Sequence, residues 1–166
     1  MDIIKVSTEE ARQCLLAYLP IASPDRAVLG KQVMEAVWED MACTQLPTWI
    51  TSIPQDWGTA LRGKLSADKW RVICIIHLTI TLIRLWGNES GRKKELLENF
   101  MDLISAVCIA NLRVSLQNQI HAYDDHIFRY VNKLKRLYPG ENLRPIHHAA
   151  LHIGKILDFF RTCPFT

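Results

Sequence analysis

The chain has 166 residues, of which 49% are hydrophobic and 22% charged. This length and composition favour one soluble domain that can bury a core, and the seven Gly and seven Pro are too few for a fibrous or low-complexity chain. Five Cys, an odd number, do not resemble the framework of a disulfide-rich secreted domain. Charged residues follow closely after Met1 and argue against a signal peptide, so we expect a reducing compartment, the nucleus or alternatively the cytoplasm.

Charge is distributed unevenly along the chain. Residues 1–60 carry four basic and eight acidic side chains, whereas residues 61–166 carry sixteen basic against nine acidic ones, a net charge of +7. This asymmetry favours an anionic partner for the second part, and nucleic acid is one candidate. For any single Lys, a solvated helix face is the simpler interpretation.

Residues 1–43 are expected to form N-terminal helices. Ser7 and Glu10 have the spacing of a capping box and open a first helix, which Pro20 ends. The run Ser23-Pro24-Asp25 supplies an N-cap, a first-turn Pro and a first-turn acid for a second helix, which ends near Cys43.

Residues 44–64 interrupt the helical period with two Pro and two Gly. They still contain Trp49 and Trp57, whose large apolar rings favour burial. We therefore expect a loop held against the core by both indoles.

Residues 66–86 are the most apolar part of the chain. Ser66 can cap a helix there, and Gly87 stands where a left-handed C-terminal residue is common. The twelve residues from Val72 to Ile83 are too few to cross a bilayer, so no membrane span is expected. A buried strand is the alternative, but the two caps and the length favour a helix that is buried on most sides.

Helical spacing continues from residue 92 to residue 160. A polar stretch near Ser115 predicts a break between two helices, Tyr138-Pro139-Gly140 ends the second, and Pro145 opens the last one. The prediction is an all-α fold: an irregular bundle of about five to seven helices around the buried central helix 66–86. Residues 1–166 are expected to form a single domain with its core in residues 65–160.

Several Cys and His residues have spacings suited to zinc. Cys74 and His77 are three apart on one helix face, and His148 and His152 are four apart on another. A thiolate and three imidazoles from the two helices would form a closed tetrahedral site, so structural zinc is a candidate cofactor. The predicted ligands are Cys74, His77, His147, His148 and His152. A Cys in the core beside a hydrogen-bonded His is the alternative interpretation.

Nothing in the sequence forms a complete active site. Cys74 and Cys108 lie in apolar runs, where burial makes a thiol unreactive. The acidic pair Asp124-Asp125 beside His126 is typical of a solvated helix face, and residues 58–63 lack the spacing of a phosphate-binding loop. We therefore expect no enzymatic activity and no small-molecule substrate.

Basic residues gather in two groups that could follow a phosphate backbone, with Tyr130 and Tyr138 interleaved in the second. The candidate nucleic-acid contacts are Arg92, Lys93, Lys94, Arg129, Lys133, Lys135, Arg136 and Arg144. No motif indicates sequence specificity, and charged helix ends would explain the same residues.

Three blocks of the sequence resemble a known family. They are residues 46–50, residues 63–86 with the run Lys69-Trp70-Arg71 and the Cys-x-x-His pair, and residues 143–154 around His147-His148. These blocks are similar to the C-terminal region of CACTA-type (En/Spm) DNA transposases of the kind found in mushroom-forming fungi. The resemblance covers roughly residues 33–160, and residues 64–86 are its most specific part.

The resemblance implies a helical insertion from an enzyme that cuts DNA with three carboxylates and two Mg²⁺ ions. In related V(D)J-type recombinases a Cys-x-x-Cys motif and a later pair of His bind zinc, and Cys74, His77, His147 and His152 follow that layout. The family continues into a Pro-Phe-Glu-Arg-like element with the last carboxylate. Here Pro164-Phe165 is followed by Thr166, and the strands that carry the first two carboxylates are absent.

Two functions follow from these patterns. The first is a non-catalytic, transposase-derived domain, nuclear, that contacts DNA or a full-length transposase through its basic face. The second is a protein-interaction or self-association module that uses an exposed apolar surface and does not bind nucleic acid. A hydrolase that uses Cys and His is a weaker third interpretation.

Overall fold

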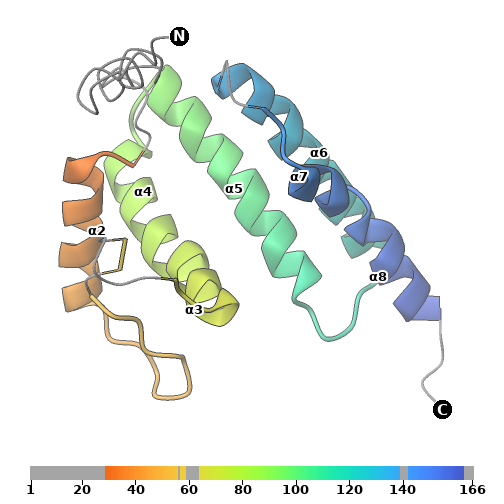
Figure 1. Ribbon diagram of the computed structural model, residues 1–166, viewed down its shortest axis with the longest axis horizontal. Coiled ribbons are helices and arrows are strands. Elements are labelled where there is room, and N and C mark those ends of the chain that lie inside the picture. Colours follow the sequence, from red (N-terminus) through yellow and green to blue (C-terminus); the bar gives the residue numbers. More distant parts are fainter. Residues whose placement is uncertain (1–28, 56, 59–63, 139–141, 163–166) are drawn as a thin grey trace, which may run out of the picture. The chain divides into compact units, whose positions relative to one another are not determined.

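The computed structural model describes residues 29–55, 57–58, 64–138 and 142–162 (Figure 1). Within these ranges the chain forms helices joined by loops, and no strand is found. The all-α class predicted from the sequence is therefore confirmed. The predicted helix from Ser7 to Pro20, the caps at Ser23-Pro24-Asp25 and the terminal run after residue 162 lie outside the described residues.

The chain divides into two units, residues 1–34 and residues 35–166. Residues 29–34 are the described part of the first unit, and helix α2 (Lys31–Cys43) begins there. The second unit contains the remainder of α2 and all later helices, and the description below concerns this unit. The predicted single domain over residues 1–166 stays a prediction.

The predicted helix 66–86 is present and has three consecutive parts. They are α3 (Ala67–Val72), a π-helical segment η2 (Ile73–Leu78) and α4 (Thr79–Trp86). The Ser66 hydroxyl accepts a hydrogen bond from the Lys69 amide at 3.4 Å, so the predicted N-cap is confirmed. Where the π-helical segment meets α4, the Thr79 hydroxyl donates a hydrogen bond to the Cys74 carbonyl at 2.8 Å.

Two details of this helix were predicted wrongly. Gly87 is right-handed, with φ −57°, because the helical backbone continues through it and its amide donates to the Ile83 carbonyl. The positive φ belongs to Gly91, at +67°, where the turn leads into the next helix. The helix is also less enclosed than expected, since Trp70, Ile80 and Ile83 are each between 45% and 49% exposed.

The loop after α2 is held to the core by one of its two Trp. Trp57 is 2% exposed, and its indole Nε1 donates to the Met41 sulfur at 2.9 Å while its ring packs edge-to-face against Trp70. Trp49 is 84% exposed, so the prediction that both indoles anchor the loop was wrong for Trp49. Further along, α2 is joined to α4 by Asp40, which accepts hydrogen bonds from Thr81 and Arg84.

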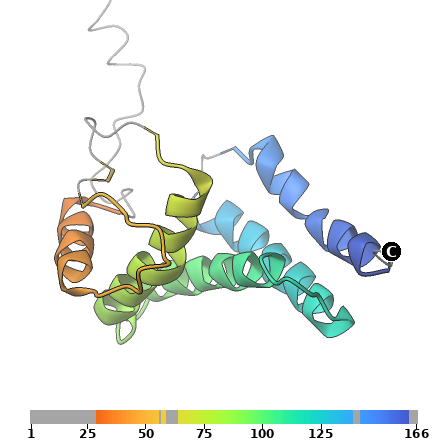
Figure 2. The same ribbon diagram turned by 90° about the horizontal axis from the view of Figure 1, so that it is seen from below.

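Helices α5 (Arg92–Ala110) and α6 (Gln117–Leu137) run antiparallel along each other and share the most extensive contact of the unit (Figures 1 and 2). The loop between them contains Ser115, so the predicted break is confirmed. At the start of α6, the Gln119 side chain accepts a hydrogen bond from the Leu116 amide at 2.8 Å.

The last predicted helix is two helices, α7 (Pro145–Ala150) and α8 (Ile153–Thr162). Pro145 opens α7 as predicted. The Tyr123 hydroxyl donates to the Ala150 carbonyl at 2.8 Å, which fixes the junction of the two helices on α6. Tyr123 also belongs to a buried apolar cluster with Ile127 and Ala106, and residues of α7 and α8 pack against this cluster. None of the described helices has the length and hydropathy that a bilayer crossing requires.

Candidate functional site

Cys74 and His77, the first predicted metal ligands, both lie in the π-helical segment. His77 is 4% exposed, and its Nδ1 has no hydrogen-bond partner among the described residues. Burial lowers the pKa of His77 and raises the pKa of the half-buried Cys74 thiol. Both groups are therefore held in their neutral forms, and Cys74 is a poor nucleophile.

The second predicted group of ligands lies on α7 and at its end. The His147 Nδ1 accepts a hydrogen bond from the Arg144 amide at 3.1 Å, and its ring contacts Tyr130 edge-to-face. The Nε2 atoms of His148 and His152 are 3.4 Å apart on the exposed side of the junction, as their spacing predicts.

The structure does not assemble these five residues into a zinc site. Among the described residues, no three side chains of His, Cys, Asp or Glu lie close enough together to hold a metal ion. The physical reason is packing: α8 lies on α6 and the α7–α8 junction is bonded to Tyr123, whereas Cys74 and His77 belong to a helix that packs on α5. The residues present therefore do not fit the predicted four-ligand zinc site.

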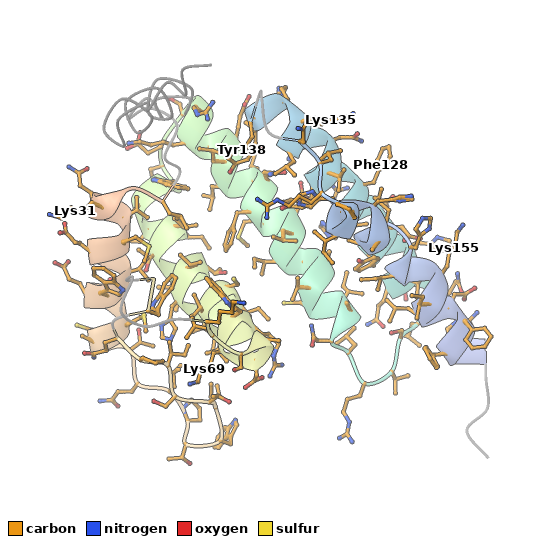
Figure 3. All side chains as sticks on the ribbon, viewed as in Figure 1. Lys31, Lys69, Phe128, Lys135, Tyr138 and Lys155 are labelled. Atoms are coloured by element: carbon orange, nitrogen blue, oxygen red, sulfur yellow. The ribbon has the colours of Figure 1, made fainter. Side chains whose placement is uncertain are left out.

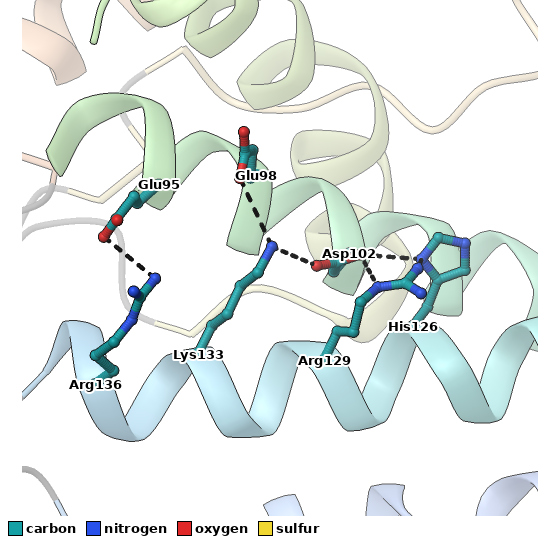
Figure 4. A network of polar contacts seen from close by, with 7 residues as sticks. All are labelled: Glu95, Glu98, Asp102, His126, Arg129, Lys133 and Arg136. Carbon is teal, nitrogen blue, oxygen red and sulfur yellow. Dashed lines mark hydrogen bonds and ion pairs between the residues drawn. The ribbon is translucent and has the colours of Figure 1, made fainter. Parts of the chain in front are cut away.

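Three of the predicted DNA contacts form ion pairs with α5 instead (Figure 4). Arg129 and Lys133 each bind one oxygen of the Asp102 carboxylate at 3.1 Å, and Arg136 lies 3.4 Å from Glu95. We call this set, with Glu98 and His126, the interhelical ladder. Its residues are spaced at three and four along both helices, so each row lies on one helix face.

Asp102 is the centre of the interhelical ladder. It is 8% exposed, accepts hydrogen bonds from Arg129 and Lys133, and lies 3.1 Å from the His126 Nδ1. Burial by itself would raise the pKa of this carboxyl group, but the contacts with His126, Lys133 and Arg129 and the charge of Lys133 outweigh burial and lower the pKa. Asp102 is therefore ionised at neutral pH, and its charge is compensated by α6.

Most of the other predicted phosphate contacts also have partners in the chain. Arg92 donates to the Leu137 carbonyl at the end of α6, Lys94 to the Gly87 carbonyl, and Lys93 pairs with Glu89. Each of these carbonyls lies at a helix end, where a cation is favourable.

Lys135 and Arg144 are the two predicted contacts whose side chains are exposed and have no partner among the described residues. Figure 3 shows Lys135 at the far end of α6 from the α5–α6 loop. The basic face is therefore much smaller than the sequence predicts.

A surface that sequence reasoning did not single out lies in the C-terminal part of the unit. Large apolar side chains that are more than half exposed occur on the loop before α6, on α6, and on α7 and α8: Val114, Leu116, Phe128, Ile146, Ile156, Phe159 and Phe160. Figure 3 shows Phe128 on the side of α6 that faces away from α5. We call this set the exposed apolar surface. Its sequence signal is the run of apolar residues on α8, which the periodicity assigns to the core.

The exposed apolar surface is hollowed at one end. Leu112 and Val114 of the α5–α6 loop and Leu157 and Phe160 of α8 line a hollow of about 300 Å³. Two segments that are 42 residues or more apart in sequence thus line one hollow, and the Phe159 ring packs edge-to-face on Phe160 beside it.

Comparison with known proteins gives no match: no protein-family model, no curated protein and no solved structure matches the chain. The resemblance to CACTA-type transposases therefore stays a prediction, and the function is argued from the geometry above.

Proposed function

We propose that this chain is a non-catalytic protein-interaction domain that binds a partner protein through the exposed apolar surface. The observation that carries the proposal is the hollow that apolar residues of the α5–α6 loop and α8 line, together with the further exposed apolar side chains on α6, α7 and α8. Contiguous apolar patches on a water-soluble surface mark sites of protein contact more often than sites of nucleic-acid contact.

The pairing of the basic residues supports the same proposal. Lys and Arg bind nucleic acid by neutralising phosphates, and this requires cations that are free to leave their own carboxylates. In the interhelical ladder, Arg129, Lys133 and Arg136 each have a carboxylate of α5 within 3.4 Å. Releasing Arg129 and Lys133 would leave the buried Asp102 carboxylate without their charges, which costs free energy.

DNA contact is the second candidate, and an origin from a transposase belongs with it. The observation that favours it is that Lys135 and Arg144 are exposed and unpaired among the described residues. Two cations would give a weak interaction with a shallow dependence on salt.

The experiment that tests the proposed function is a selection from a random peptide library against the folded chain. The control target is the double variant F159S/F160S, in which both substitutions lie at exposed positions and folding is verified by circular dichroism. We expect peptides that bind the native chain and lose at least tenfold in affinity for the variant. If every selected peptide binds both targets equally, the proposed function is wrong.

A further inference from the structure

Two cations are among the side chains of the hollow on the exposed apolar surface. Arg113 and Arg161 line it together with the four apolar side chains. Arg113 is exposed and has no ion pair among the described residues, whereas Nε and Nη2 of Arg161 both donate to one oxygen of Asp158, at 3.2 and 2.9 Å. A guanidinium group has five N–H donors, so Arg161 keeps donors for a second acceptor.

The size of the hollow limits what can occupy it. About 300 Å³ is at the lower end of the range for small-molecule pockets and suits one large side chain rather than a cofactor. Val114 is 75% and Phe160 54% exposed, so the hollow is open to an approaching chain. An aromatic or branched aliphatic side chain inserted there would remove the apolar walls from water.

The charges beside the hollow determine which partner fits. A two-fold dimer centred on the hollow would bring the unpaired Arg113 of both copies toward one another, and like charges at an interface are unfavourable. The phosphates of a nucleic acid would pair with the two Arg. The apolar side chains of Leu112, Val114 and Phe160 would then face charged phosphates, which is unfavourable. A peptide that carries carboxylates on each side of an apolar residue can place the apolar side chain in the hollow and pair its carboxylates with the Arg side chains.

We propose that the hollow between the α5–α6 loop and α8 binds an acidic segment of another protein, which inserts one large apolar side chain and pairs its carboxylates with Arg113 and Arg161. This inference rests on the proposed function and specifies its partner class. The net charge of +7 over residues 61–166 attracts such a segment from a distance and speeds its association.

The test uses the full chain and the peptides recovered by the library selection. Their sequences should contain Asp or Glu on both sides of one aromatic or large aliphatic residue. Affinity should fall about tenfold in R113E and should also fall as salt is raised. The matched control K135E makes the same charge change about 27 Å away along α6 and should leave affinity within twofold. Both positions are exposed, so neither substitution disturbs the core.

Each outcome bears on a different claim. Neutral or basic peptides that still discriminate against F159S/F160S would overturn the acidic partner while leaving the proposed function in place. Equal losses of peptide affinity in R113E and K135E would also overturn the acidic partner, because the attraction would then depend on the overall charge of the chain and not on Arg113. Peptides that bind the native chain and F159S/F160S equally would overturn both proposals.

Discussion

Asp102 is the residue on which the contact between α5 and α6 depends most. Its carboxylate is almost fully buried and contacts three side chains of α6, accepting hydrogen bonds from Arg129 and Lys133 and lying 3.1 Å from His126. Removing one member of a buried ion pair costs more than the pair contributes, because the remaining charge is left uncompensated. The partners of Asp102 are partly exposed, so water reduces this cost.

We predict that D102N lowers the free energy of unfolding by about 2 kcal/mol at pH 7. The amide keeps the shape of the side chain and loses its charge. Chemical denaturation with urea measures the change. The matched control is D158N, which breaks a surface pair between residues three apart and should cost at most about 0.5 kcal/mol. Equal effects would mean that Asp102 is as solvated as Asp158.

The difference in the free energy of unfolding between the native chain and D102N should be smaller in acid. The pKa of Asp102 is lowered on folding, so its contribution to stability is present above its ordinary pKa of 3.8 and is lost as the pH falls through the lower folded value. The difference between the native chain and D102N should therefore shrink below pH 4. A constant difference down to pH 2 would contradict the assigned hydrogen bonds.

His77 gives a second pH dependence, at higher pH. Burial lowers its pKa from 6.5, so the unfolded chain takes up a proton before the folded chain does. The stability associated with neutral His77 is present above pH 6.5 and is lost as the pH falls. We predict that H77L, which has nothing to titrate, loses less stability between pH 7 and pH 5 than the native chain does. Identical slopes in urea denaturation would show that His77 is accessible to water.

At the scale of elements, α8 packs on α6 with Gly154 beside the Asp124 side chain. A Cβ atom at Gly154 would lie 2.0 Å from one carboxylate oxygen of Asp124. No side chain fits there without displacing Asp124. The junction with α7 is fixed at the same place by the bond from Tyr123 to Ala150.

We predict that G154A changes the free energy of unfolding by less than about 1 kcal/mol, because Ala is the better helix former by about that amount and the exposed Asp124 side chain must turn away to admit it. In a D124A background the obstructing carboxylate is absent, so G154A should be neutral or stabilising. Urea denaturation of the four variants measures this coupling. A change of the same sign and size in both backgrounds would show that Asp124 is not the obstacle.

The sequence predicts the helices better than their packing. Ser66, Ser115 and Pro145 mark boundaries correctly because capping, loop and first-turn preferences are local. Gly87 was misplaced because two glycines, at 87 and 91, compete for one turn, and the choice between them depends on where α5 begins. Trp49 was misplaced because an indole is equally apolar whether the fold covers it or leaves it exposed.

For the whole molecule, the candidate site could be predicted only in part. Charge counts correctly indicate a basic α6, but they do not show that Glu95, Glu98 and Asp102 of α5 face it. This pairing depends on the register of two helices, which no local pattern specifies. The hollow likewise joins residues of the α5–α6 loop to residues of α8, and their proximity follows from tertiary packing.

The central claim is that α6 uses its cations inside the molecule while the surface beside the α5–α6 loop and α8 binds a partner. Chemical-shift mapping of the isotope-labelled chain tests it most directly, with duplex DNA added to one sample and a selected acidic peptide to another. We predict that the peptide shifts the signals of residues 112–116 and 153–161, and that DNA leaves Arg129, Lys133 and Arg136 unchanged. DNA-induced shifts along those three residues, with no response at the hollow to the peptide, would contradict the account.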